Sequence, residues 1–358
     1  MAIKVSKKRL STIAIAVLII FPFVNPDPFT LFIFTVALLW AIVALNLNIL
    51  IGYGGIFFIS PMIFVAVAGY ASAWLSLPTG APTCPAHEGC LGLHPFQSIL
   101  IGATLAAIFS FAFSLLSTRL RGLYMALYSL VFTLFLGTVA VQSHPAIFYW
   151  TGGPNGMGQL PDIVVGGFEF RSLNGIAYYY LELTILIISA LVLTALLKSR
   201  IGLALRTLRD AETYSTILGV NPLKIKVYVF AITAFFMGIA GGVWVHFFSS
   251  IQVAGTAGGA VGGPWSPSWI NFFLIILVYG GLGTFVGPVV GSFILVLLEQ
   301  NLKIYGAWGP VIIAATVIGV LLITPEGVVG RIQNYFAAKR GEHPITIPRV
   351  LLEKAKGK

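Results

Sequence analysis

The sequence contains a succession of apolar runs, each about 20 residues long. A helix of about 20 apolar residues crosses the roughly 30 Å hydrocarbon core of a membrane, and it satisfies its own backbone there. Charged residues make up 9% of the chain and apolar residues 58%, whereas soluble proteins carry about 25% charged residues. This composition excludes a soluble enzyme and a disordered regulator. We predict an all-α membrane protein, a polytopic bundle of about ten transmembrane helices, with spans near 10–25, 29–51, 56–77, 96–118, 122–142, 176–197, 227–250, 269–282, 286–300 and 304–324.

The eighth and ninth predicted spans are short and have glycines and a proline between them. They fit either two tilted spans or one broken, re-entrant pair. The first span follows basic residues, as a secretory signal does, but no small-x-small cleavage site comes after it. We therefore predict that it stays as an uncleaved anchor.

The basic residues predict the orientation. With the N-terminus in the cytoplasm, 19 of the 21 Lys and Arg residues fall on the cytoplasmic side, in the segments 4–9, 119–121, 198–226 and 331–358, and only Arg171 and Lys303 fall outside. Basic residues accumulate in cytoplasmic loops of membrane proteins, so both termini are predicted to be cytoplasmic. The net charge of +10 is thus a topology signal and not a nucleic-acid-binding surface. Residues 1–330 form the predicted membrane domain, and 331–358 a basic cytoplasmic tail that contacts solvent or lipid.

The predicted spans offer little catalytic or ion-coupling chemistry. Asp27, Glu182 and Glu299 all lie near predicted span ends, where they are predicted to reach headgroup water, and no span carries a central charged residue. Ion-coupled carriers usually place ionisable groups at membrane depth. The sequence also lacks a phosphate-binding loop and the common metalloprotease and hydrolase motifs. We predict no enzymatic activity, no cofactor and no resident metal, so energy for active transport would come from another subunit.

The segment 198–226 is the largest predicted internal cytoplasmic segment. A narrow apolar stripe recurs in it at helical spacing and predicts a helix over 203–219; its residues are Ala204, Leu208, Ala211, Ser215 and Leu218. Gly219 suits the left-handed position after a helix, and Asn221-Pro222 prevents continuation. Arg206, Arg209, Asp210 and Glu212 are predicted to face water or a partner. The helix either lies on lipid headgroups or docks onto another protein.

Two glycine clusters interrupt the apolar runs, at Ile51–Gly55 and Tyr279–Gly283, and each is followed by a proline. Such interruptions free backbone groups, which lipid cannot satisfy, and they often mark transporter sites. The alternative is close helix packing through small residues. The candidate pathway or hinge residues are Asn46, Gly52, Gly54, Gly55, Gly281, Gly283, Gly287 and Pro288.

Cys84 and Cys90 lie in a predicted outer loop with His87 and His94. A disulfide is favoured because the outer side is oxidising. Free thiols and a tetrahedral metal site with the two histidines remain alternatives.

Several short motifs occur along the chain, and they are Leu45-Asn46-Leu47, Gly52-Tyr53-Gly54-Gly55, Gly69-Tyr70, Arg121-Gly122-Leu123-Tyr124, 151–156, Arg209-Asp210-Ala211-Glu212, 218–221, 280–284 with Gly287-Pro288, and 324–327. Together they resemble the permeases of ABC importers, and more narrowly the branched-chain amino-acid permease family. The resemblance covers roughly 38–330. It implies an ABC-importer permease fold, a second permease subunit (identical or distinct), two cytoplasmic ATPases, an external solute-binding protein and an amino-acid substrate. It also implies that Arg209, Asp210, Ala211, Glu212, Leu218 and Gly219 belong to the loop that couples to the ATPases.

The chain departs from this family at two places. Tyr214 and Ser215 stand where the family has an Ala-Ala pair. Ile56, Phe58 and Pro61 stand where it usually has Gln, Ser and His. The second departure leaves the substrate open, with urea, short amides or another small organic solute as alternatives. From a different class, an ATP-independent carrier or channel is the alternative.

Overall fold

The computed structural model describes residues 18–23, 27–81, 84, 90–117, 120, 122–142, 151–152, 156–165, 168–170, 175–210, 215, 219–253, 263–266, 268–306, 308–324 and 326–338. The chain is helical along most of this length, as the apolar runs predict. The first predicted span lies largely outside the described residues.

The helix α2 (Pro28–Asn48) forms the centre of the molecule. Asp27 caps its start, because the hydroxyl and the backbone N–H of Thr30 both donate to the Asp27 carboxylate, at 2.7 and 3.0 Å. These hydrogen bonds hold the pKa of Asp27 below its usual value. At its other end α2 widens into the π-helical turn η1 (Ile49–Tyr53).

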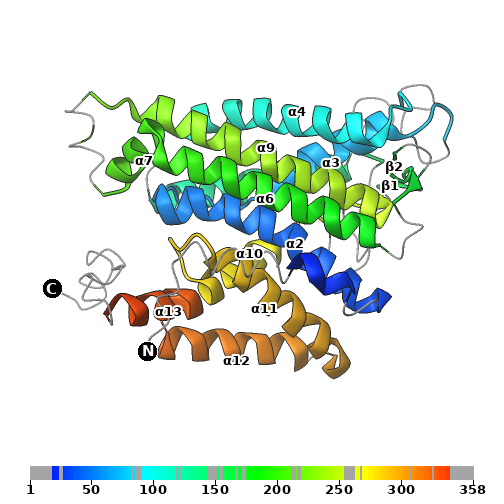
Figure 1. The fold of residues 1–358 in the computed structure, drawn as a ribbon. Coiled ribbons are helices and arrows are strands. Elements are labelled where there is room, and N and C mark those ends of the chain that lie inside the picture. The colour runs from blue at the N-terminus through cyan, green and yellow to red at the C-terminus, as the bar shows by residue number, and fades with distance from the viewer. Residues whose placement is uncertain are drawn as a thin grey trace.

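The other helices surround α2 (Figure 1). On one side of α2, the helices α3 and α9 pack closely with α4. The helices α6 and α11 lie directly against α2. The helices α10 to α13 form a group on the other side of the molecule, and α12 is the outermost of them (Figure 1). The bounds are α3 (Met62–Ser76), α4 (Pro95–Ser117), α5 (Leu123–Val141), α6 (Ile176–Lys198), α7 (Arg200–Asp210), α9 (Pro222–Phe248), α10 (Ser268–Gly280), α11 (Gly287–Leu302), η3 (Lys303–Tyr305), α12 (Trp308–Ile323) and α13 (Gly327–Ala338).

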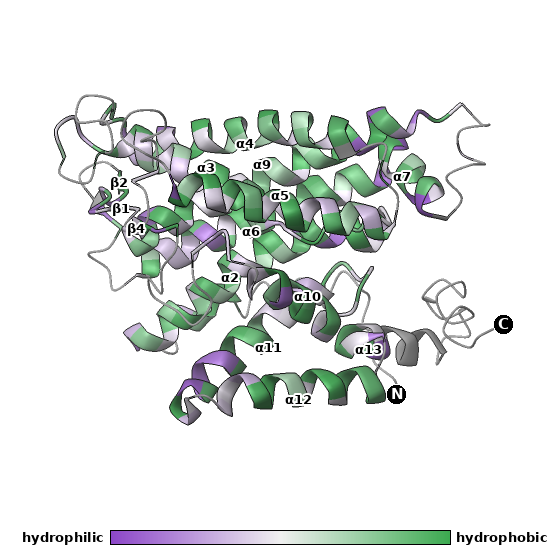
Figure 2. Ribbon diagram, turned by 180° about the vertical axis from the view of Figure 1, so that it is seen from behind, coloured by the Kyte–Doolittle hydropathy of each residue, from purple (hydrophilic) through white to green (hydrophobic). Residues whose placement is uncertain are grey.

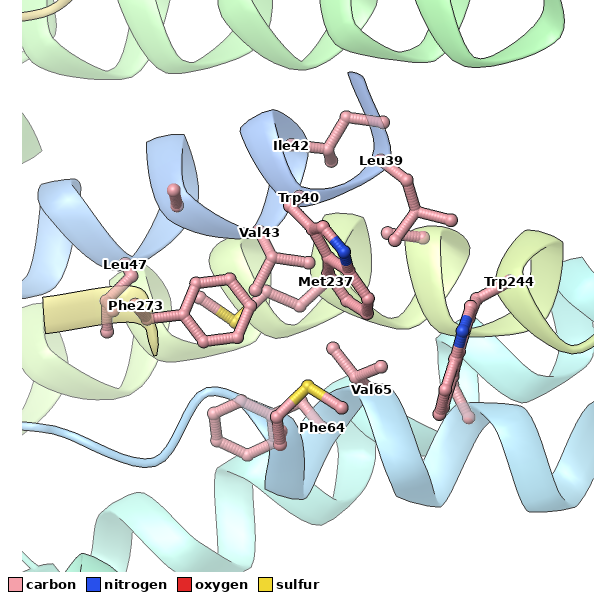
Figure 3. Packing of buried hydrophobic residues seen from close by; sticks show 14 of the residues in the cluster. Leu39, Trp40, Ile42, Val43, Leu47, Phe64, Val65, Met237, Trp244 and Phe273 are labelled. Carbon is pink, nitrogen blue, oxygen red and sulfur yellow. The ribbon is translucent and has the colours of Figure 1, made fainter. Parts of the chain in front are cut away.

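Large apolar side chains fill the space around α2 (Figure 3). The Trp40 ring lies 5.9 Å from that of Trp244 on α9 and 4.5 Å from that of Trp269 on α10. Phe273 on α10 joins the same cluster, 5.8 Å from Trp40. Burial of aromatic rings of this size contributes much of the packing energy of a core. The central position of α2 therefore follows from its nearly uniform apolar sequence, which leaves no polar face to expose.

Seven of the described helices are long and apolar enough to cross a membrane. Each predicted span from 29 onward contains one described helix, although α3 and α10 are too short to cross alone. Hydrophobic residues cover the helices along their length, and hydrophilic ones gather at α7 and toward the opposite end near β1 and β2 (Figure 2). The fold is therefore an all-α polytopic bundle with short and broken helices, as predicted.

Four two-residue strands lie at the end of the bundle away from α7 (Figures 1 and 2). Here β1 (Met157–Gly158) pairs antiparallel with β4 (Ser250–Ile251), and β2 (Val164–Val165) pairs with β3 (Phe168–Glu169). These pairs hold the loop between α5 and α6 against the end of α9. The helix α13 continues through residue 330, where the basic tail was predicted to begin, and 339–358 lie outside the described residues.

The prediction that Glu182 reaches headgroup water is wrong. Glu182 lies about two turns into α6 and is fully buried, on the helix that packs against α2. Neither of its carboxyl oxygens has a hydrogen-bond partner among the described residues. The prediction failed because the distance of a residue from a span end does not report which neighbouring helix covers its side chain.

Candidate coupling site at the glycine breaks

The first break is the widened end of α2. Backbone hydrogen bonds run from Gly54 N–H to Ile49 O (2.9 Å) and from Ile56 N–H to Leu50 O (2.9 Å), spacings longer than the four residues of an α-helix. Gly55 then takes a φ of +63°, which residues with a side chain rarely adopt. The helix therefore stops here, and the chain continues without helical structure to Pro61.

The second break joins α10 to α11. Gly281 and Gly283 have φ values of +96° and +77°, and the Thr284 hydroxyl donates to Gly281 O at 2.7 Å. Gly280 and Gly287 touch through their backbones, so a Cβ on Gly280 would collide with the Gly287 carbonyl. The two helices contact each other along their length. The short spans predicted at 269–282 and 286–300 are thus a closely packed helix pair around a tight glycine turn.

Asn48 joins the two breaks. Its side-chain Nδ2 donates to Thr284 O at 2.8 Å, and its Oδ1 accepts from the Gly283 N–H at 3.0 Å. The side chain is fully buried. A Cβ on Gly52 would lie 2.6 Å from the Gly283 nitrogen, so only glycine fits at that position. The predicted hinge glycines of both clusters therefore meet at one place in the molecule.

Asn46, in contrast, lies away from the breaks. Its Nδ2 donates to Ile42 O (2.8 Å) and to the Ser189 hydroxyl on α6 (3.0 Å). Sequence reasoning selected Asn46 and missed Asn48, although both are polar residues in the same apolar run. The two differ by about half a helical turn, which places their side chains on different neighbours.

The helix α7 lies directly against the first break. Arg209 Nη1 donates to Gly52 O at 2.6 Å, and a Cβ on Gly55 would lie 2.9 Å from Arg209 Cγ. The Arg206 guanidinium lies 5.7 Å from the centre of the Tyr53 ring. Leu205, which the predicted apolar stripe omitted, is fully buried beside Gly54. A charged hydrogen bond to a backbone carbonyl is stronger than a neutral one, so Arg209 fastens α7 to the break.

The predicted helix over 203–219 begins three residues earlier, at Arg200, and its described part ends at Asp210. Gly219 has a φ of +83°, and Asn221 then caps α9, its Oδ1 accepting from the Lys224 N–H at 3.3 Å. Ala211, Glu212 and Leu218, named as coupling residues with Asp210, lie outside the described residues, as does Tyr214.

The structure joins Cys84 and Cys90 by a disulfide. Of the two nearby histidines, His94 bonds through Nε2 with Val164 O at 2.5 Å, and His87 lies outside the described residues. The outer loop is thus braced covalently at the end of the bundle opposite α7.

A bundle of membrane-crossing helices with two joined breaks and a polar helix fastened to one of them has the form of a transport permease. The family of permease components of branched-chain amino acid transport systems matches residues 29–324, and the chain belongs to this family. It is a multi-pass inner-membrane protein and a permease subunit of an ABC importer, a transport class and not an enzyme class.

Named relatives agree with the family. The chain is 25% identical over 359 residues to the high-affinity branched-chain amino acid transport system permease protein LivM of Escherichia coli (strain K12), covering 94% of this chain and 78% of the relative. It is 25% identical to LivM of Salmonella typhimurium, covering 86% and 72%. It is 27% identical over 180 residues to the permease protein BraD of Pseudomonas aeruginosa, covering 48% and 55%. No solved structure matches the chain.

Proposed function

We propose that this subunit transports branched-chain or related amino acids, delivered by an external solute-binding protein and driven by two partner ATPases. The names of the relatives support the substrate class. The single structural observation behind the proposed mechanism is the hydrogen bond from Arg209 to Gly52 O, since it ties a peripheral polar helix to the place where α2 breaks.

In the proposed mechanism α7 is a lever on the cytoplasmic side. The ATPases pull on the loop 198–226 when they close on ATP. Arg209 passes the motion to Gly52, and Asn48 passes it to Gly283 and Thr284. Small shifts produce large changes where a packed element has two arrangements, and a π-helical turn ending in glycines is such an element.

This mechanism divides the coupling residues into two groups. Arg209 holds α7 to the membrane domain, since its guanidinium already contacts Gly52. Asp210, Ala211, Glu212 and Leu218 are proposed to contact the ATPases, and Gly219 to set the turn into α9. The membrane arrangement follows the basic residues, with α7 and both termini in the cytoplasm.

Affinity purification of the tagged chain from native membrane in mild detergent tests the proposal. Two ATPases, a second permease and a binding protein that retains a branched-chain amino acid are the expected partners. A binding protein that retains urea or an amide would change the proposed substrate but would still support an ABC importer. A chain that purifies alone and conducts solute without ATP would contradict the proposal.

Two variants test the assignment of the loop itself. Glu212→Arg and Gly219→Val should leave membrane insertion intact and separate ATP hydrolysis from uptake. Uptake at the unaltered rate in both variants would contradict the coupling role of the loop 198–226.

A further inference from the structure

The segment Gly55–Ser60 is not helical, although it forms what would otherwise be the first part of the third span. Its burial alternates as in a strand. Ile56, Phe58 and Ser60 are buried, whereas Gly55 and Phe57 are exposed and Ile59 is partly exposed. Phe58 packs against the rings of Phe64, Phe113 and Phe230, at 5.3 to 5.6 Å. One face of the segment is therefore fixed in the core and the other is uncovered.

The backbone of this segment is only partly hydrogen-bonded. Phe58 N–H donates to Ile56 O at 2.7 Å, and Ile59 N–H donates to the Ser129 hydroxyl at 3.3 Å. Within the part of the chain that the structure describes, nothing donates to the carbonyl oxygens of Phe57, Phe58 or Ile59. The buried Ser60 hydroxyl also has no described partner.

The segment lies at membrane depth. Ser129 lies six residues from the start of α5 at Leu123, about 9 Å along the helix. The predicted span on α9 begins at residue 227, after Lys224 and Lys226, so Phe230 lies three residues inside it, about 4.5 Å along the helix. Both distances fall inside a hydrocarbon core about 30 Å thick. A carbonyl oxygen without a hydrogen-bond donor costs several kcal/mol of free energy when it faces lipid, so lipid cannot cover this segment.

We propose that the exposed face of Gly55, Phe57 and Ile59 lines a water-filled route through the membrane, and that the carbonyl oxygens of Phe57 and Ile59 accept N–H groups of a passing solute bearing a primary ammonium. The proposal rests on the proposed transport function and adds a place for the route. Irregular backbone occurs at membrane depth only where it is buried in protein or lines a cavity. In this subunit, without its partner permease, one face of the segment is buried and the other is open, and the proposal assigns the open face to the cavity.

The proposal also changes the sequence-based view of this segment. Ile56, Phe58 and Pro61 stand where the family has polar residues, and that substitution suggested an altered pathway. All three side chains are buried in this subunit. The residues between them are the ones that would meet solute, and the selectivity then depends on Phe57, Ile59 and the backbone.

Thiol labelling tests the route. The native cysteines are joined in a disulfide, so Phe57→Cys and Ile59→Cys add single reactive thiols. Membranes containing the complete importer are treated with the membrane-impermeant cation methanethiosulfonate ethyltrimethylammonium. Leu191→Cys, on the exposed surface of α6, is the matched control for a lipid-facing side chain. Uptake of the variants confirms that they fold.

We expect Phe57→Cys and Ile59→Cys to react about ten-fold faster or more than Leu191→Cys, because only the thiolate form of cysteine reacts. Contact with lipid raises the pKa of a thiol, and each unit of that rise removes about nine-tenths of the thiolate. Leucine with its binding protein should slow the labelling, whereas 4-methylpentanoate, which lacks the amine, should not. Labelling of both variants as slow as that of Leu191→Cys would overturn the route. Labelling unaffected by leucine would overturn the solute contact. Neither result depends on which ATPases co-purify, so failure of this proposal is distinct from failure of the proposed function.

Discussion

The two glycine breaks look alike in the sequence but differ in the structure. At the α10–α11 break, Gly280 and Gly287 touch through their backbones and Thr284 closes a turn that leads directly into the next helix. At the α2 break, the glycines are also closely packed, but the helix widens, an arginine from α7 holds one carbonyl, and the non-helical segment beyond has one open face. The same residue type thus joins two helices at one break and ends a helix in an irregular segment at the other.

This difference suggests separate roles for the breaks. A movable element needs a fixed neighbour to move against, and Asn48 connects the two. In the proposed mechanism, the α10–α11 turn is the fixed part of the site, and the α2 end is the part that α7 displaces.

The largest expected effect is on the rigid break. Gly280→Ala places a methyl group against the Gly287 carbonyl and should lower the stability by about 3 kcal/mol. Gly319→Ala is the matched control, because nothing lies within 4 Å of its new Cβ. Thermal unfolding in detergent measures both. An equal midpoint for the two variants would mean that the α10–α11 break is not rigid.

Removing the connection between the breaks should have the next largest effect. Asn48→Ala leaves Thr284 O and Gly283 N–H buried without their partner, at a cost of about 2 kcal/mol or more. Asn301→Ala, which loses an exposed bond to Leu297 O, is the control. ATP-driven uptake should fall in the first variant alone. If uptake and unfolding are the same in both, the breaks are independent.

The disulfide at the opposite end should contribute stability without affecting the breaks. Replacing Cys84 and Cys90 by Ser should cost about 2 kcal/mol, through the loop that the bond closes. Uptake per ATP hydrolysed should stay unchanged at a temperature where the protein is folded. A loss of stability caused by a chelator, and not by a reductant, would instead indicate a metal site.

The smallest effect is expected at Arg206. Its contact with the Tyr53 ring is exposed to solvent and should contribute under 1 kcal/mol, about the value of an exposed cation–π pair. Arg206→Ala should therefore leave uptake near the unaltered rate. A large loss of uptake would mean that Arg206, and not Arg209, makes the main contact between α7 and the α2 break.

The sequence predicted the helices well because lipid imposes one strong rule on length and composition. The runs that became α4, α5 and α6 differ from their predicted bounds by a few residues at most. The third span was wrong in part, because 56–61 is as apolar as a transmembrane helix but is not helical, and α3 begins only at Met62. Hydropathy measures transfer into lipid and does not report backbone conformation.

The candidate site was predicted as separate pieces. The glycines marked both breaks, and the basic loop marked α7. The contacts that unite them, Asn48 with Thr284 and Arg209 with Gly52, join residues 236 and 157 positions apart. One sequence carries no signal for such pairs. The same limit explains the error at Glu182, whose burial depends on how α6 packs against α2.

The bond between Arg209 and Gly52 O is the central claim of the mechanism, and Arg209→Ala in the reconstituted importer tests it most directly. Uptake and ATP hydrolysis are measured together in proteoliposomes, with Arg206→Ala as the control. We expect Arg209→Ala to hydrolyse ATP and to transport about ten-fold less solute per ATP, the range of a typical coupling energy. An unaltered ratio of uptake to hydrolysis would contradict the role of Arg209 in moving the α2 break.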